Sequence, residues 1–77
     1  MTPTFLRAKN LRFVVYPKDH APPHIHVIGP DAEAKFVIET LKCTYSWGFS
    51  EKALREIGDF LKGKKKFLQE AWDDYQE

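Results

Sequence analysis

The sequence predicts an α+β domain in which a three- or four-stranded antiparallel meander is packed on one face by two C-terminal helices, or by one bent helix. Two observations support this fold. Between residues 11 and 43, short β-branched and aromatic segments with alternating polarity are separated by turn residues, which indicates strands. From residue 50 onward, apolar residues recur every three or four positions, which indicates helix. A chain of 77 residues is expected to form a single domain, 1–77.

The composition is that of a folded domain with little net charge. Hydrophobic residues make up 43% of the chain, aromatic residues 14% and charged residues 30%, which excludes the disordered class. The formal net charge of +1 argues against a nucleic-acid binder held mainly by phosphate contacts. Residues 1–30 nevertheless carry four basic residues against one acidic residue, so a modest basic patch is compatible with the sequence.

The chain carries no recognisable targeting signal. Its first residues lack the basic and then apolar pattern of a secretion signal, and no apolar run approaches the roughly 18 residues of a membrane span. The lone Cys43 has no partner for an internal disulfide, so the fold does not depend on an oxidising compartment. We therefore expect a cytoplasmic protein without membrane contact.

Strand and turn signals follow each other along the first half of the chain. Residues 1–9 show no periodicity and are expected to form an arm. Pro22 and Pro23 favour extended geometry, so the chain should enter residue 24 already stretched. Residues 29–31 give a strong turn signal. The predicted strands are residues 11–16, 24–28 and 34–39, with 41–43 as a short fourth strand or an edge extension.

The alternation within these segments predicts two different sheet faces. One face is apolar and should be covered by the helices; its members are Leu11, Phe13, Val15, Ile25, Val27, Ala34, Phe36 and Ile38. The other face should carry Arg12, Val14, Tyr16, His24, His26, Ile28, Lys35, Val37 and Glu39. A turn at residues 29–32 would pair His26 with Lys35 and His24 with Val37. The alternating pattern specifies the register, because a slip by one residue would move the apolar side chains to the other face.

The C-terminal part of the chain is expected to be helical. Ser50 is a good N-cap with Glu51 in the first turn, and Gly63 is a plausible stop. The first stretch has helical spacing at Leu54, Ile57 and Leu61, and the second, residues 64–76, has an apolar stripe of Phe67, Leu68, Ala71, Trp72 and Tyr75. We expect this stripe to belong to the core. Trp47, just before the helices, either staples the helix entry or is exposed for a partner.

All three histidines lie within residues 19–27, which makes this stretch the candidate functional site. His24 and His26 are two residues apart on an extended segment, so both side chains leave the same face. One interpretation is a zinc site in which His20 or Asp19 adds a ligand to His24 and His26. No second cysteine is present to contribute, so the prediction is a protein without a cofactor, with zinc as the alternative.

A second interpretation is acid–base chemistry on RNA. His24, His26 and Lys35 would be the catalytic groups, because metal-independent RNA cleavage needs a base, an acid and a cation that holds the phosphate. Additional binding residues would be Arg12, Tyr16, Asp19 and His20.

A third interpretation is structural. Asp19 would order the loop through a side-chain turn, and the histidines would satisfy local hydrogen bonds or pack beside Tyr16. Lys62 and residues 64–66 are ordinary for a solvated helix junction, although contact with RNA or an acidic partner is an alternative.

The motifs also resemble those of domain-of-unknown-function family 4160, a group of small bacterial proteins. The matching residues cover nearly the whole chain: residues 13–16, the string Asp19-His20-x-Pro22-Pro23-His24-x-His26-Val27, residues 33–35, Gly48-Phe49-Ser50 and Trp72. The resemblance implies no established activity; members of the family are often encoded beside another small protein, and some are proposed as toxin–antitoxin components. The lysine-rich residues 64–66 depart from the more mixed pattern of relatives.

The sequence thus favours a small toxin–antitoxin-like protein whose histidine-bearing sheet face contacts RNA or performs acid–base chemistry on it. The alternatives are a non-catalytic interaction module that pairs with another small protein, and a histidine-based metal-binding domain. The same face, with Val14, Ile28 and Val37 among its polar groups, is also compatible with a homodimer.

Overall fold

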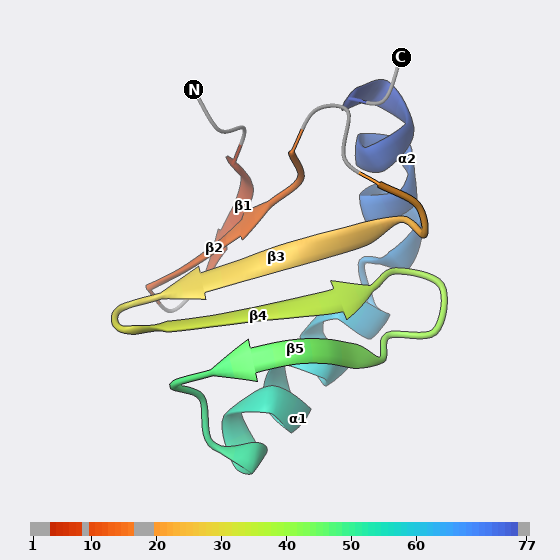
Figure 1. Ribbon diagram of the computed structural model, residues 1–77. Helices are drawn as coiled ribbons and strands as arrows, with labels where there is room; N and C mark the ends of the chain where they lie inside the picture. The colour runs from red at the N-terminus through yellow and green to blue at the C-terminus, as the bar shows by residue number, and fades with distance from the viewer. Residues whose placement is uncertain (1–3, 9, 17–19, 76–77) are drawn as a thin grey trace.

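The computed structural model describes residues 4–8, 10–16 and 20–75 of the chain. Five strands form one antiparallel sheet in the order β1-β2-β3-β4-β5, and two helices follow them (Figure 1). The strands are β1 (Thr4–Ala8), β2 (Leu11–Val14), β3 (His24–Gly29), β4 (Ala32–Val37) and β5 (Cys43–Trp47), and the helices are α1 (Glu51–Lys62) and α2 (Lys65–Tyr75).

The predicted α+β class, the antiparallel meander and the two C-terminal helices are confirmed. The sheet has more strands than expected, because residues 4–8, predicted as part of an arm, form β1 and pair with β2. The predicted first strand is shorter, since β2 ends at Val14 rather than at Tyr16. Of the predicted extension at residues 41–43, only Cys43 belongs to a strand, as the first residue of β5. β5 pairs with β4 and forms the edge of the sheet opposite β1.

The register of the central hairpin is the predicted one. His26 lies opposite Lys35 and His24 lies opposite Val37 in the antiparallel pair of β3 and β4. On the other side of β3, His26 lies opposite Val14 of β2. This register brings both histidines and Lys35 to the same face of the sheet, because residues directly opposite each other point the same way.

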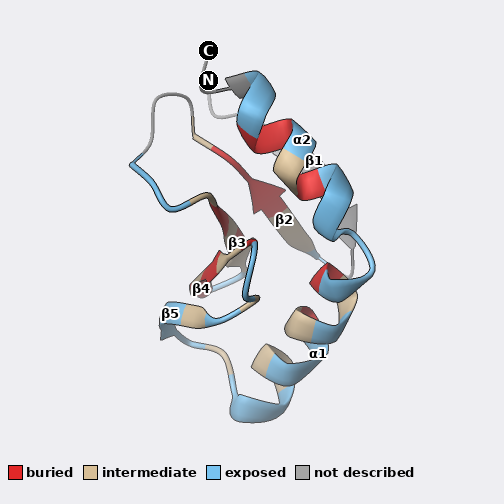
Figure 2. Cartoon of the chain, turned by 90° about the vertical axis from the view of Figure 1, so that its right-hand side faces the viewer, coloured by how far each residue is buried: buried red, intermediate tan, exposed pale blue. Residues whose placement is uncertain are grey.

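The apolar face of the sheet and the helices enclose the core, and Figure 2 shows the two layers side by side. Burial of this apolar surface is the main driving force for folding. The buried cluster combines sheet residues Phe13, Val15, Ile25, Val27, Ala34, Phe36 and Ile38 with helix residues Ile57, Leu61, Leu68 and Trp72. Leu11 is partly buried and packs against the cluster. The predicted apolar face is therefore confirmed.

Both helix boundaries follow the local signals in the sequence. The Ser50 side chain accepts a hydrogen bond of 3.0 Å from the backbone N–H of Ala53, and Glu51 stands in the first turn of α1. Such an N-cap is worth about 1 kcal/mol. Gly63 caps the C-terminal end, and its N–H donates to the carbonyl of Phe60 at 3.3 Å. Two separate helices form rather than one bent helix.

The Gly48-Phe49-Ser50 motif before α1 begins with a glycine for a conformational reason. Its φ is +82°, in the left-handed region that glycine tolerates. A Cβ atom at this position would also collide with the backbone of Asp31 and Ala32. Glycine therefore lets the end of β5 lie directly against the turn between β3 and β4.

Several aromatic residues are more exposed than a core position would allow. Phe67, predicted as part of the core stripe of α2, is 45% exposed, so that prediction is wrong for this residue. The rest of the described stripe, Leu68, Ala71 and Trp72, is buried. Trp47 on β5 is 50% exposed, which favours the predicted exposed position over a staple at the helix entry.

Among the described residues, no helix combines the length and the apolar character needed to cross a bilayer.

Candidate functional site

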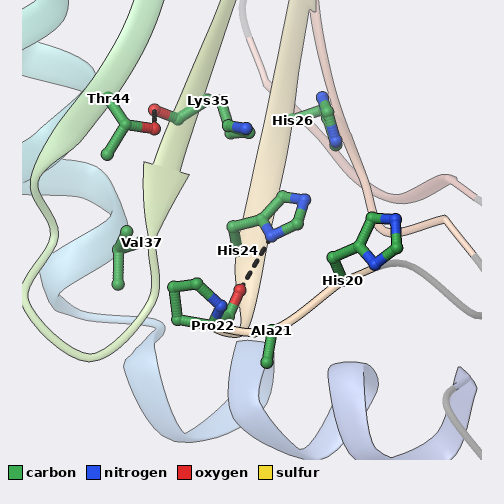
Figure 3. Close-up of a pocket in the computed structure, with 8 residues that line it drawn as sticks. All are labelled: His20, Ala21, Pro22, His24, His26, Lys35, Val37 and Thr44. Atoms are coloured by element: carbon green, nitrogen blue, oxygen red, sulfur yellow. Dashed lines mark hydrogen bonds between the residues drawn. The ribbon is translucent and has the colours of Figure 1, made fainter.

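A cleft of about 310 Å³ opens on the sheet face opposite the apolar core, where β3 begins and β4 ends (Figure 3). The loop before β3 forms one wall and the strands β3, β4 and β5 form the other. The lining residues are His20, Ala21, Pro22, His24, His26, Lys35, Val37 and Thr44. The cleft therefore contains all three histidines together with Lys35.

His24 is the most buried polar residue of the cleft. The residue lies on the sheet face that was not expected to be covered by the helices, but it is only 6% exposed. The reason is its tertiary environment. His24 is the first residue of β3, and the beginning of β3 lies beside α2 (Figure 1). The centroid of the His24 ring is 5.1 Å from that of the Trp72 ring. A residue of the helical layer thus helps to cover a side chain of the opposite sheet face.

The hydrogen bond of His24 defines which ring nitrogen can act as a base. Nδ1 lies 2.8 Å from the backbone carbonyl oxygen of Pro22 (Figure 3). A carbonyl oxygen only accepts hydrogen bonds, so Nδ1 carries the proton in this geometry. In the neutral ring, Nε2 is then the acceptor, which is the atom that could take up a proton.

His26 lies between the rings of two neighbours and close to a carboxylate. Its ring centroid is 5.1 Å from that of His24 and 4.6 Å from that of Tyr16, both in edge-on arrangements. Nδ1 is 3.6 Å from an Oε atom of Glu33, and the His26 side chain is 17% exposed. A protonated His26 would therefore form an ion pair with Glu33. Tyr16 contributes packing to the site, as the structural interpretation expected.

Lys35 and Thr44 complete the strand side of the cleft. Lys35 lies opposite His26 across β3 and β4. The Thr44 hydroxyl is 3.5 Å from the Lys35 carbonyl oxygen, a distance that allows a weak hydrogen bond from β5 to β4. Thr44 was not predicted at the site, because the expected fourth strand stopped at residue 43. The amphipathic alternation of residues 43–47 was the signal that could have identified it.

The other predicted binding residues take different positions. His20 lines the cleft from the loop and is exposed. Arg12 lies opposite Ile28, at the other end of β3 from His24 and outside the residues that line the cleft. Asp19 lies outside the described residues. The structure thus brings together His20, His24, His26 and Lys35, and it places Arg12 away from them.

The zinc interpretation requires at least three suitable ligands at one point. Within residues 4–8, 10–16 and 20–75, no group of three histidine, cysteine, aspartate or glutamate side chains is arranged to hold a metal ion. The predicted ligand Asp19 is not among these residues, so the zinc hypothesis stays a prediction.

Comparison with known proteins gives one match. A family model described as "Domain of unknown function (DUF4160)" matches residues 10–73, which include every described residue of the cleft. Searches of the curated proteins and of the solved structures found no match.

Proposed function

The chain belongs to the DUF4160 family, and from this premise we propose that it acts on RNA by acid–base chemistry in the histidine cleft. The family itself is a domain of unknown function, so the proposal rests on the residues of the cleft. His24 is the base, His26 is the acid and Lys35 holds the phosphate.

The hydrogen bond between His24 Nδ1 and the Pro22 carbonyl is the observation that supports this proposal most directly. It leaves Nε2 as the proton acceptor and holds the ring in one orientation against Trp72. A general base must have a defined tautomer and a fixed position relative to its substrate. Lys35 lines the same cleft and supplies the cation that the proposed reaction needs.

The proposed reaction is an intramolecular transesterification of the RNA phosphodiester. His24 Nε2 takes the proton of a ribose 2′-hydroxyl, and the 2′-oxygen attacks the adjacent phosphorus. A new bond forms between the 2′-oxygen and phosphorus while the bond from phosphorus to the 5′-oxygen breaks. Protonated His26 donates its proton to the leaving 5′-oxygen, and the products are a 2′,3′-cyclic phosphate and a 5′-hydroxyl. Lys35 stabilises the negative charge that develops on the phosphate oxygens.

Cellular context follows from the same proposal. We propose that the chain is the RNA-cleaving member of a cytoplasmic toxin–antitoxin-like pair and that another small protein restrains it. Expression of the chain alone should then slow growth, and the His24→Asn variant should not. Equal growth of cells that express the parent and the variant would contradict this role.

The catalytic part is tested with purified protein and RNA. We expect the parent to release fragments that end in a 2′,3′-cyclic phosphate, with a bell-shaped dependence of the rate on pH, since one histidine must be neutral and the other protonated. Loss of a general base typically lowers the rate by about 10²–10⁴-fold. The readout is the rate of fragment formation, together with identification of the fragment ends.

His24→Asn is the matched variant, because asparagine has an N–H donor near the position of Nδ1 and can keep the bond to Pro22. It has no group that titrates near neutral pH. If His24 is structural, this variant should keep its activity, and retained activity would overturn the proposed role. His26→Gln tests the acid in the same way. Absence of RNA cleavage by the parent protein would refute the catalytic proposal.

A non-catalytic interaction module is the second candidate function, and the exposed aromatic residues of β5 favour it. Tyr45 is 51% exposed and Trp47 is 50% exposed, on the edge strand of the sheet. Exposed tyrosine and tryptophan are enriched at protein interfaces. If the parent protein does not cleave RNA but a Trp47→Ala variant loses binding to a small partner protein, this second function is supported.

A further inference from the structure

We infer that the substrate of the histidine cleft is single-stranded RNA, whose chain leaves the cleft across the beginning of α2 and is held there by a lysine cluster. The lysine cluster consists of Lys64, Lys65 and Lys66. This inference rests on the proposed function, and it adds to it the class of RNA and the path of the strand. Neither the cleft nor its chemistry requires these lysines.

Two further hollows are lined by members of the lysine cluster, and one of them lies next to the loop that borders the cleft. The first is lined by Pro23, Ile38, Glu39, Lys65, Lys66 and Gln69. Pro23 directly follows Pro22, which lines the histidine cleft, so the cleft and this hollow lie on either side of one short segment. Figure 3 shows this segment between the cleft and the ribbon of α2.

The second hollow continues from the first along α2. It is lined by Gly63, Lys64, Lys66, Phe67 and Glu70. Lys66 lines both hollows and therefore joins them. Neighbouring lining residues thus lead from Pro22 at the cleft over Pro23 to Lys66 and on to Phe67, and this is the path that we propose for the strand.

The charge of this path suits a phosphate backbone. Lys62, Lys64, Lys65 and Lys66 are four lysines within five residues, and all are exposed. The first turn of α2 contains no acidic residue, although a helix N-terminus normally favours one. Glu39 and Glu70 line the two hollows but leave the lysines in excess. A polyanion would remove the repulsion between these neighbouring positive charges.

Phe67 indicates that the polyanion is a single strand. Its ring is exposed although it lies on an otherwise buried helical stripe, and it lines the same hollow as Lys64 and Lys66. Proteins bind single strands by combining cations that hold phosphates with aromatic rings on which bases stack. In a duplex, the bases stack on each other and are not available to such a ring. An acidic peptide has no bases that could stack on Phe67.

The test measures binding of a fluorescent 2′-O-methyl uridine dodecamer, which cannot be cleaved by 2′-hydroxyl attack. The Lys65→Ala/Lys66→Ala variant should bind on the order of tenfold more weakly than the parent. The slope of log affinity against log salt should become shallower by about 1.4, at about 0.7 for each lost contact to a single strand. Lys42→Ala/Lys52→Ala is the matched control, because both lysines are exposed and line none of these hollows. It should leave both quantities unchanged.

Phe67 provides a second measurement that does not depend on charge. Phe67→Ala should weaken binding of the dodecamer about tenfold, and Phe67→Leu should weaken it almost as much, since leucine has no face on which a base can stack. Full affinity in Phe67→Leu would show that only apolar area matters and would overturn the stacking argument. Weaker binding to the single strand than to a duplex of the same length would also overturn the inference.

Cleavage of a dinucleotide separates this inference from the proposed function. A dinucleotide has a single phosphate, which Lys35 holds in the proposed reaction, so it has none left for the lysine cluster. The lysine variant should therefore cleave it as fast as the parent, while His24→Asn should not cleave it. If the parent cleaves RNA but the lysine variant keeps its affinity and salt slope, the inference fails and the proposed function stands. If no RNA is cleaved but the dodecamer binds through the lysines, the proposed function fails and the binding path stands. Equal, lysine-dependent binding of polyglutamate would assign the cluster to an acidic protein and overturn the inference.

Discussion

The two faces of the sheet differ in how their side chains are buried. On the face toward the helices, the central residues of β3 and β4 are all apolar and fully enclosed, among them Ile25, Val27 and Ala34. On the opposite face, burial depends on position: His24 is buried beside α2, whereas Ile28 and Glu33 at the other end remain partly exposed. The first face provides the stability of the domain. The second face is where polar side chains are partly buried.

This difference indicates where chemistry can occur in so small a domain. Burial of a polar group without a hydrogen-bond partner costs free energy, so a buried polar residue needs such a partner. His24 has one in the carbonyl of Pro22, and its ring gains further contact with Trp72. Partial burial also lowers the effective dielectric constant, which strengthens electrostatic interactions with a bound substrate. The buried end of the second face is therefore the better position for a catalytic group than its exposed end.

The largest expected effect comes from two neighbouring residues of β4 that point to opposite faces. Phe36 is buried in the core, whereas Val37 lines the cleft. Phe36→Ala should lower the free energy of unfolding by about 3–5 kcal/mol, and Val37→Ala by about 1 kcal/mol. Urea unfolding followed by circular dichroism measures both values, with an unchanged denaturant slope as the control. Similar losses in the two variants would contradict the division of the sheet into a core face and a site face. A Phe36→Ala protein that is already unfolded without urea would agree with it.

A smaller effect is expected from the contact that joins the two faces. The ring of His24 packs against Trp72 of α2, so their contributions to stability should be coupled. In a double-mutant cycle with His24→Asn and Trp72→Leu, we expect a coupling energy of about 0.5–1.5 kcal/mol. Thermal or urea unfolding of the four proteins gives this value. A coupling energy of zero would mean that the helical layer does not support the site.

The smallest effect is expected from removal of metal ions. In the acid–base proposal, the cleft needs no metal, so the rate of RNA cleavage should be the same with and without EDTA. The zinc hypothesis predicts instead that equimolar Zn²⁺ shifts the NMR signals of His20, His24 and His26 together. Loss of activity in EDTA combined with these shifts would replace the acid–base proposal by a metal site.

Much of the fold could be predicted because it follows from local patterns. Alternation places Phe13, Ile25 and Phe36 on one face, and the short turn before β4 then determines that His26 lies opposite Lys35. Ser50 marks the start of α1 by its own capping side chain, and Gly63 follows its last residue. The pairing of β1 could not be predicted in this way, since it depends on the edge that β2 leaves available.

The candidate site was only partly visible in the sequence. The spacing of His24 and His26 shows that they share a face, and the register adds Lys35. It does not show that Arg12 belongs to the other end of β3, or that Thr44 of β5 lines the cleft. Both depend on the length and pairing of neighbouring strands, which are decided by several segments together.

The sequence by itself determined the order of the elements, the two faces of the sheet and the residues available for chemistry, because periodicity and capping act over a few neighbouring residues. Only the tertiary structure decided that His24 is buried, that its Nδ1 bonds to Pro22, and that Pro23 and Lys66 line the same hollow. The physical reason is that burial and groove formation depend on which distant segments pack together. Trp72 lies 48 residues after His24, and no local pattern relates the two rings.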